Sequence, residues 1–348
     1  MPGKDTCRGV LPENKMIIMK QLIPLLLLLF AGKFCYSQTV HVLTSGTKTS
    51  LRGLSVVDDQ TIWASGSGGM VARSTNGGAS FSWTKVAGFE KTEFRDIEAF
   101  DSNTAIIMAI DSPAYILKTT DGGRSWKTVY KNNTKGMFLD AMDFSDEKYG
   151  VVIGDPIGGK FFLAETSDGG QSWKELSADK RPSADSGEAC FASSGTNIRL
   201  LKNGEKVFIS GGLSSHFYIN GRRMNLPIIQ GKETTGANSV GSKDKKNMIV
   251  VGGDFNTKDS TTQNCFITRD GGKHWTAPAV APHGYRSCVE YIMENTWLSC
   301  GLNGVDITQD GGYTFKQISK EGFHVCRKAK NGNAVYFAGG NGRIAILF

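Results

Sequence analysis

The chain has 348 residues, of which 39% are hydrophobic, with 43 glycines, 9 prolines and a formal net charge of +7. This composition supports a large core and excludes a disordered chain. The glycines separate short runs of Val, Ile, Phe and Trp, which is typical of an all-β protein with many tight turns.

Residues 1–37 differ from the rest. After Lys20 comes QLIPLLLLLFAGKFCYSQ, an apolar segment between a basic flank and small residues, which predicts a secretory signal cleaved before Gln38. Its unbroken apolar run, Leu25–Ala31, is far shorter than the roughly 20 residues of a spanning helix, so we expect no membrane span after cleavage. The chain is therefore expected to comprise an N-terminal extension with signal peptide (1–37) and one exported domain (38–348), which is periplasmic, cell-surface or extracellular.

Charge and cysteine spacing limit the partners of the exported part. Residues 1–37 carry five basic and two acidic residues, so the net charge of the remaining chain is +4 rather than +7. No basic run is interleaved with aromatic residues, so a nucleic-acid partner is not expected. Five cysteines follow residue 37, an odd number that leaves at least one thiol unpaired, and they match no zinc motif, so no metal is expected. Cys288 and Cys326 occupy one repeat position: a disulfide between them is possible, but packing as small apolar residues is favoured.

The expected elements after the signal are short strands in seven units. Residues 39–46 form a lone strand, and the units begin near Leu51, Phe94, Phe138, Gly187, Thr234, Tyr285 and Phe323. Each unit holds apolar runs of strand length, and four antiparallel strands make one propeller blade. The last unit has only three runs, so we expect residues 39–46 to supply its outer strand. The predicted fold is an all-β, seven-bladed propeller whose ring is closed by the N-terminal strand, which protects the sheet edges.

A turn motif recurs through these units, as in TTDGGRSW at 119–126 and TSDGGQSW at 166–173. The anchors are Asn76, Asp121, Asp168, Asp270 and Asp310, and the aromatics that follow are Trp126, Trp173, Trp275 and Phe315. A weaker copy is expected at Asn220-Gly221. Asp-Gly favours a tight hairpin because glycine adopts positive φ, the Asp accepts hydrogen bonds within the turn, and the aromatic packs on neighbouring strands. These residues are therefore predicted to be structural.

The motif S/T-x-D-G-G-x-S/T-W resembles the Asp-box, or BNR repeat. Together with GDPIGG, GEACFASSGT, VVGGDF and GYRSCV, it makes nearly the whole of the expected mature chain similar to the Ycf48/Hcf136-like propellers, and more narrowly to their exported bacterial members. The resemblance implies a propeller with a binding or assembly role. Such members are often described as oxidoreductases or photosystem II stability/assembly factor-like proteins. The sequence contains no dinucleotide-binding glycine motif, CxxC or CxxCH, so we expect no cofactor.

The candidate site lies opposite the turn motifs. One set of polar residues begins the inner strands, and a second set sits in the loop after the second strand, so both are expected at one tunnel mouth. The first set is Arg52, Arg95, Glu188, Arg286 and His324, with Tyr285 beside Arg286; the second is Asp111, Asp155 and Asp254. Arginines and carboxylates at a concave mouth suit a charged ligand. In the alternative interpretation, the arginines pair with these acids to hold adjacent blades in register.

Two functions follow from this arrangement. The first is a monomeric binding or assembly scaffold for a protein or an anionic or glycan ligand. The second is a glycan-active hydrolase, sialidase-like or glycoside-hydrolase-like, that uses Asp155, Glu188 or Asp254 as acid and base. Sialidases share the Asp-box, but this chain lacks their N-terminal Arg-Ile-Pro segment and has seven units rather than six. The first function is preferred because no further catalytic motif is present.

Overall fold

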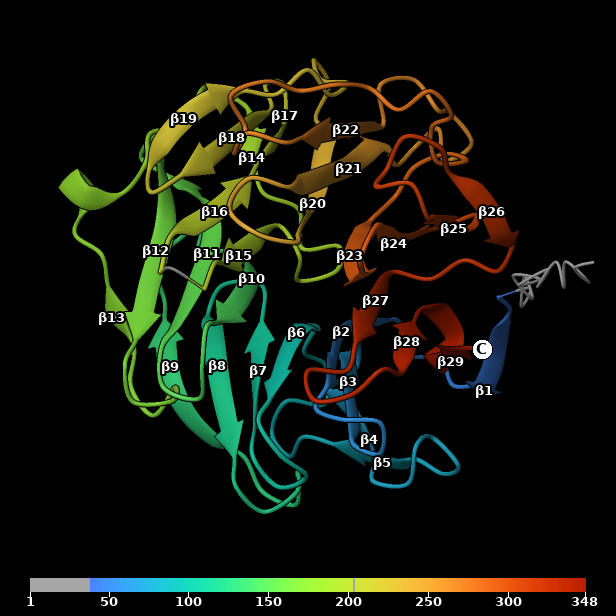
Figure 1. Cartoon of the computed structure of the whole chain (residues 1–348). Helices are drawn as coiled ribbons and strands as arrows, with labels where there is room; N and C mark the ends of the chain where they lie inside the picture. The colour runs from blue at the N-terminus through green and yellow to red at the C-terminus, as the bar shows by residue number, and fades with distance from the viewer. Residues whose placement is uncertain (1–37, 203) are drawn as a thin grey trace, which may run out of the picture. The chain divides into compact units, whose positions relative to one another are not determined.

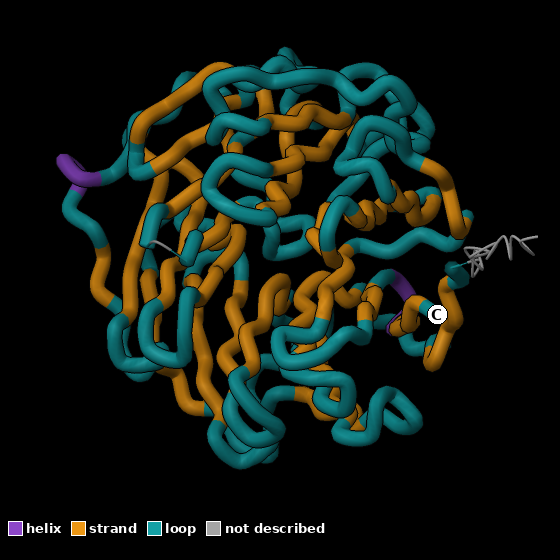
Figure 2. The backbone as a smooth tube through the Cα atoms, in the orientation of Figure 1, coloured by secondary structure: helices purple, strands orange, loops and turns teal. Residues whose placement is uncertain are grey.

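Short apolar runs separated by glycine-rich turns form seven antiparallel sheets arranged around a common centre (Figure 1). The computed structural model describes residues 38–202 and 204–348, and the predicted signal peptide at 1–37 lies outside the described residues. Strands make up most of the ring, and the two helical segments are the single 3-10 turns η1 (Ala178–Lys180) and η2 (Gly340–Gly342) among the residues described (Figure 2). The all-β, seven-bladed prediction is confirmed.

The first strand of each blade faces the centre. These inner strands are β2 (Leu51–Val56), β6 (Phe94–Ala99), β10 (Leu139–Phe144), β15 (Ile198–Leu200), β20 (Thr235–Ser242), β23 (Cys288–Met293) and β27 (Val325–Lys328), for blades 1 to 7. Figure 1 shows them gathered around the middle of the ring. Their inward edges pair with no further strand in six of the seven sheets, so most of the ring turns unpaired backbone groups toward the centre.

The remaining strands complete each blade toward the outside. They are β3 (Ile62–Gly66), β4 (Met70–Ser74) and β5 (Ser82–Lys85) in blade 1; β7 (Ala105–Ala109), β8 (Ala114–Thr119) and β9 (Lys127–Asn132) in blade 2; β11 (Gly150–Ile157), β12 (Lys160–Thr166) and β13 (Lys174–Glu175) in blade 3; β16 (Lys206–Ile209), β18 (His216–Ile219) and β19 (Arg222–Asn225) in blade 4; β21 (Met248–Asp254) and β22 (Cys265–Thr268) in blade 5; and β24 (Thr296–Gly301), β25 (Gly304–Thr308) and β26 (Lys316–Ser319) in blade 6. Blade 5 has only a single bridge, Ile267 to Thr276, in place of an outer strand. The weaker turn copy predicted at Asn220-Gly221 joins β18 to β19.

Blade 7 is closed by the N-terminal strand, as predicted. Its sheet runs β27, β28 (Val335–Ala338), β29 (Ile344–Leu347) and β1 (Val40–Thr44). Val40 pairs with Leu347, and Thr39 and Phe348 exchange both backbone hydrogen bonds at 2.9 Å. The two ends of the described chain thus share one sheet, which removes an exposed edge at this point of the ring.

Side chains fasten the inner strands of neighbouring blades to one another. In four of the junctions, a Ser or Asp on one inner strand accepts a backbone N–H of the next inner strand. The pairs are Ser55 with Ala99 (3.0 Å), Asp96 with Met142 (2.8 Å), Asp143 with Leu200 (2.6 Å) and Ser239 with Val289 (2.9 Å). We call these contacts the inter-blade staples. They provide acceptors for buried backbone donors that have no strand beside them.

The prediction that the fourth blade begins at Gly187 is wrong. Its inner strand is β15, eleven residues later, whereas Glu188 lies on the short strand β14 (Glu188–Ala189). β14 pairs with β17 (Gly211–Gly212), which joins β20 of blade 5 through Gly211 and Gly236. A Cβ on Gly236, at φ +130°, would lie 2.4 Å from the Gly211 Cα, so this contact requires glycine. Residues 190–197 lie outside the strands of the blade, and they bring the buried polar side chains of Ser194, Thr196 and Asn197 with them.

The turn after β12 shows how the repeated motif is held. The Asp168 carboxylate accepts hydrogen bonds from the Thr166 hydroxyl (2.8 Å), the Ser172 hydroxyl (2.6 Å) and the Ser172 N–H (3.0 Å). Trp173 then packs edge-on against Phe144, with ring centroids 5.9 Å apart. Partial burial opposes ionisation of Asp168, but the hydrogen bonds from Ser172 and Thr166 outweigh it and lower the pKa to about 2.

No helix among residues 38–202 and 204–348 has the length and apolar character needed to cross a bilayer.

Replacing Asp168 by alanine is expected to lower the free energy of unfolding by about 1 kcal/mol at pH 7, the usual cost of losing a carboxylate that caps backbone donors. Since the folded pKa lies below the unfolded value of about 3.9, the contribution is complete above pH 4 and disappears as the pH falls toward 2. Urea unfolding of both proteins between pH 2 and pH 7 measures it. A difference that does not change with pH would show that the carboxylate charge is not involved.

Candidate functional site

The ring has two mouths, defined by the direction of the inner strands. We call the end where these strands begin the first mouth and the end where they finish the second mouth. Each mouth contains a cavity, of about 450 Å³ at the first mouth and about 560 Å³ at the second. Arg52 and Arg95, at the start of β2 and β6, line the first, and Val56 and Ala99, at their ends, line the second.

A segment between blades 3 and 4 fills the centre of the ring between the two cavities. We call residues 190–197 the plug. Arginines from three inner strands donate to its backbone carbonyls: Arg52 Nη1 to Ser193 (3.2 Å), Arg95 Nη1 to Ala192 (3.5 Å) and Arg327 Nη2 to Gly195 (3.0 Å). The buried Ser194 hydroxyl donates to the Ser287 carbonyl at 2.6 Å. The plug is thus bonded to both sides of the ring and gives the first-mouth cavity a floor.

The first-mouth cavity combines two guanidinium groups with aromatic rings. Arg52 and Arg95 face Phe138, Phe191 and Phe255. The Phe191 and Phe255 rings meet edge-on, with centroids 6.0 Å apart, which holds the apolar wall in place. Arg95 retains 27% of its side-chain exposure. The cavity therefore offers a positive charge beside an apolar surface.

The neighbouring titratable groups compensate this charge only in part, and less as the pH falls. Burial, together with the charges of Arg52 and Arg95, lowers the pKa of His324 to about 3, so its ring is neutral at physiological pH. Burial raises the pKa of Asp155 to about 6, although its Oδ1 accepts the Cys190 N–H at 2.9 Å. Glu93 lies 3.6 Å from Arg95 Nε. The aspartate can therefore lose its charge within the physiological pH range.

The structure brings together five of the nine predicted site residues. Arg52, Arg95, Asp155, Tyr285 and His324 line the first-mouth cavity. Asp111 lies instead on an exposed turn at φ +24°, outside the cavity lining. A common repeat position thus predicted the shared mouth for most of these residues but not for all.

Arg286 is a correction to the predicted arginine ring, because its side chain is fully buried and does not line the cavity. Its Nε donates to Asp306 at 2.6 Å and its Nη2 donates to the same carboxylate. Nη1 donates to the Asn303 side chain at 2.6 Å and to the Tyr285 carbonyl at 2.9 Å. Arg286 therefore matches the alternative interpretation, an arginine paired for architecture, although its acid lies on β25 of its own blade.

Glu188 and Asp254 also lie away from the cavity lining. Glu188 Oε1 accepts from the Tyr218 hydroxyl at 2.8 Å and the Ser210 hydroxyl, and it lies 3.0 Å from His216 Nδ1. Asp254 is buried and accepts the Asn256 N–H at 3.0 Å. Donors of metal-ligand type do meet at Asp185, Glu188 and His216, but Arg223 ion-pairs with Asp185 at 2.5 Å. The cluster is accordingly an ion-pair network in which Asp185 and Arg223 are exposed and Glu188 is buried.

Sequence reasoning missed the apolar half of the cavity. Phe191 and Ala192 come from the plug, Phe255 follows β21, and Phe138 precedes β10. The plug has a signal in the sequence, the polar run Ser193-Ser194-Gly195-Thr196-Asn197, which interrupts the apolar pattern of a unit. Such a run indicates that the unit contains a segment outside its blade.

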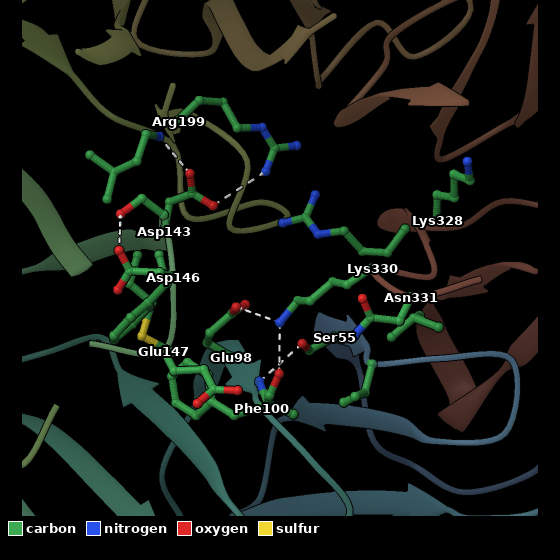
Figure 3. Close-up of a pocket in the computed structure, with 18 of the residues that line it drawn as sticks. Ser55, Glu98, Phe100, Asp143, Asp146, Glu147, Arg199, Lys328, Lys330 and Asn331 are labelled. Carbon is green, nitrogen blue, oxygen red and sulfur yellow. Dashed lines mark hydrogen bonds and ion pairs between the residues drawn. The ribbon is translucent and has the colours of Figure 1, made fainter. Parts of the chain in front are cut away.

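The second-mouth cavity is lined by charges that are paired with one another (Figure 3). Arg199 lies 3.1 Å from Glu290 and 3.8 Å from Asp143. Lys330 points at Glu98, with the ion pair at 2.5 Å, and also donates to the Ala99 carbonyl at 2.7 Å. Most of these cations therefore already have an acid partner, whereas at the first mouth Arg95 has Glu93 at 3.6 Å and Arg52 donates to a backbone carbonyl.

No protein-family model matches the sequence, and no curated protein matches it either. Among solved structures, the chain is similar to a Ycf48 described as bound to D1 peptide, with a TM-score of 0.63, 16% identity and coverage of 89% of this chain and 96% of that one. Ycf48 from Cyanidioschyzon merolae has a TM-score of 0.63 and 14% identity, with coverage of 88% of this chain and 98% of that one. The WD40 propeller domain of Doa1 has a TM-score of 0.59 and 13% identity, with coverage of 89% of this chain and 97% of that one. These likenesses show a Ycf48-like propeller fold. Membership of the exported bacterial Asp-box group stays a prediction.

Replacing Arg286 by alanine is expected to lower the free energy of unfolding by about 3 to 5 kcal/mol, because it leaves the buried Asp306 carboxylate without its cation. Replacing the pair together, as Arg286→Met with Asp306→Leu, is expected to recover much of that loss. Lys328→Ala serves as the control for removing a cation near the ring centre. Urea denaturation measures all four proteins. A loss of less than about 1 kcal/mol for Arg286→Ala would contradict the architectural role.

Proposed function

We propose that the chain is a binding scaffold that holds a segment of a partner protein at the first mouth. The segment carries a carboxylate next to an apolar side chain. The observation that carries this proposal is the cavity in which Arg52 and Arg95 face Phe138, Phe191 and Phe255. Guanidinium groups bind carboxylates through paired N–H donors, and a cavity of about 450 Å³ accommodates a few side chains of a peptide.

Structural neighbours support a protein ligand. One Ycf48 is described as bound to D1 peptide, so a propeller of this fold accommodates a peptide. We extend to this chain only the class of ligand, a peptide segment, and infer its chemistry from the cavity itself. Because the segment after Lys20 predicts export, we place the partner in the periplasm, at the cell surface or outside the cell.

The hydrolase alternative has weaker support. A glycoside hydrolase needs two carboxyl groups on either side of the scissile bond. Of Asp155, Glu188 and Asp254, only Asp155 lines the cavity, and Glu188 is committed to Ser210, His216 and Tyr218. Binding is thus the better interpretation of this mouth.

Replacing both cavity arginines, as Arg52→Gln with Arg95→Gln, is expected to weaken peptide binding at least tenfold, about 1.4 kcal/mol, because the carboxylate loses its donors. Peptides selected from a random display library on the wild-type chain provide the ligands, and calorimetry measures their affinity. We expect acidic residues beside apolar ones in the selected sequences. Thermal unfolding checks that the plug and the ring survive the substitutions.

The matched control removes two cations from the second mouth, as Lys202→Ala with Lys328→Ala, and is expected to bind like wild type. Equal loss in both double variants would indicate a general charge effect and contradict the assigned site. A screen with glycan and sialoside substrates is expected to show no hydrolysis, and turnover abolished by Asp155→Asn would support the hydrolase instead.

Binding is also expected to strengthen as the pH falls through about 6. Asp155 is ionised above this value and opposes an incoming carboxylate, whereas below it the side chain is neutral. His324 titrates near 3, so it contributes no change between pH 5 and 7. We expect a gain of about tenfold from pH 7.5 to pH 5, and a flat profile for Asp155→Asn. An unchanged slope in that variant would assign the pH dependence to the peptide.

A further inference from the structure

Three thiols meet at the junction between blades 6 and 7. Cys288 on β23 and Cys300 on β24 are directly paired across the two strands, and Cys326 comes from β27 of the next blade. All three side chains are fully buried and free, and their sulfur atoms lie within 4.8 Å of one another, with 3.8 Å between Cys288 Sγ and Cys326 Sγ. We call them the thiol cluster.

The cluster occupies the place of an inter-blade staple. At four other junctions, a Ser or Asp oxygen accepts the N–H of the next inner strand, at 2.6 to 3.0 Å. Here the Cys288 sulfur accepts the Cys326 N–H at 3.4 Å and also the Cys326 thiol, and its own thiol donates to the Cys326 carbonyl at 3.4 Å. A sulfur is a weaker acceptor than oxygen, so this junction gives up hydrogen-bond strength at this contact. Backbone N–H donation to a sulfur is, in contrast, a feature that stabilises thiolates in metal sites.

We propose that the thiol cluster binds one Cu(I) ion through the three sulfur atoms. A metal–sulfur bond of about 2.3 Å in a tetrahedral or trigonal site places sulfur atoms roughly 3.8 to 4 Å apart. Cys288 Sγ and Cys326 Sγ are at 3.8 Å, and all three sulfur atoms lie within 4.8 Å of one another. Thiolates select soft ions, of which Cu(I) and Zn(II) are the common ones. A structural zinc takes four ligands, whereas no fourth Cys, His, Asp or Glu joins this group among the described residues.

The surroundings favour a bound monovalent ion with a negatively charged ligand set. The group is fully buried, so an open fourth position for water is not provided. Two arginines act electrostatically on this group: Arg327, with 14% of its side chain exposed, acts on Cys288, and the fully buried Arg286, which is also paired with Asp306, acts on Cys300. The three cysteines would bind the metal as thiolates, so loading releases their protons, and a cation beside the group offsets part of the resulting negative charge.

The test uses the full chain expressed with added copper salt and purified under anaerobic conditions. We expect one Cu per chain by mass spectrometry under native conditions, and copper X-ray absorption with three sulfur neighbours. In competition with a coloured Cu(I) chelator, Cys288→Ser, Cys300→Ser and Cys326→Ser are each expected to lower the affinity at least about 100-fold, since they remove a ligand itself.

Cys265→Ser is the matched control, because Cys265 is a buried free thiol outside the cluster and its substitution is expected to leave copper binding unchanged. Equal copper binding in all variants would assign the metal to other cysteines and overturn the proposal. So would the absence of binding against the chelator, a stoichiometric Zn(II) ion in place of copper, or a disulfide between Cys288 and Cys326 in peptide maps. If the serine variants do not fold, the X-ray absorption of the wild-type chain decides.

Discussion

The inward edges of the inner strands are the constraint on which the rest of this molecule depends. Six of the seven sheets expose backbone N–H and C=O groups to the centre of the ring, where there is no further strand to pair with them. Buried donors and acceptors without partners would cost about 1 to 3 kcal/mol each. The inter-blade staples satisfy part of this need and at the same time fix each blade to the next. The order of blades around the ring is therefore held by side-chain oxygens as well as by apolar packing.

The plug extends this arrangement and creates the candidate site. Its carbonyls accept hydrogen bonds from Arg52, Arg95 and Arg327. These arginines of the inner strands therefore use some of their N–H donors to hold the plug. A guanidinium has five N–H donors, and each of these bonds uses only one of them. Arg52 and Arg95 can thus position the cavity floor and still bind a carboxylate above it. The hydrogen bonds from Arg52 and Arg95 to the plug also fix the cavity floor relative to the two arginines.

Much of the fold could be predicted from the sequence, because each blade repeats a local pattern of strand length and turn chemistry. The place of Arg52 and Arg95 followed from their position at the start of an inner strand. Arg286 shares that repeat position, but its side chain is buried instead of lining the cavity, because of a residue on another strand. Asp306 stands two residues before the Thr of its turn motif; the residues at this place in the other motif-bearing blades are Ala72, Leu117, Ala164 and Phe266. A single carboxylate in this otherwise apolar position draws the arginine inward.

The plug and the complete thiol cluster could not be predicted, because both depend on contacts between units rather than within one. The shared repeat position of Cys288 and Cys326 indicated that these two thiols could meet across neighbouring blades, but the spacing does not place Cys300 beside them, since the register of β23 and β24 decides it. Likewise, the polar run of the plug indicates that this segment lies outside the blade, but it does not indicate that the segment occupies the centre of the ring. Repeat analysis describes each blade separately, and the sites of this protein lie at junctions.

The contrast between the two mouths gives a physical reason to place binding at the first. At the second mouth, Arg199 has Glu290 and Asp143 within 4 Å, and Lys330 has Glu98, so a charged ligand would have to displace an existing ion pair. At the first mouth, Arg52 and Arg95 donate to neutral carbonyls, His324 is neutral, and Asp155 loses its charge near pH 6. An anionic group entering there replaces only water and a partner at the rim, Glu93, and it gains two guanidinium groups in a partly desolvated site. The smaller cavity is therefore the better anion site, because availability of charge matters more than volume or the number of charged residues.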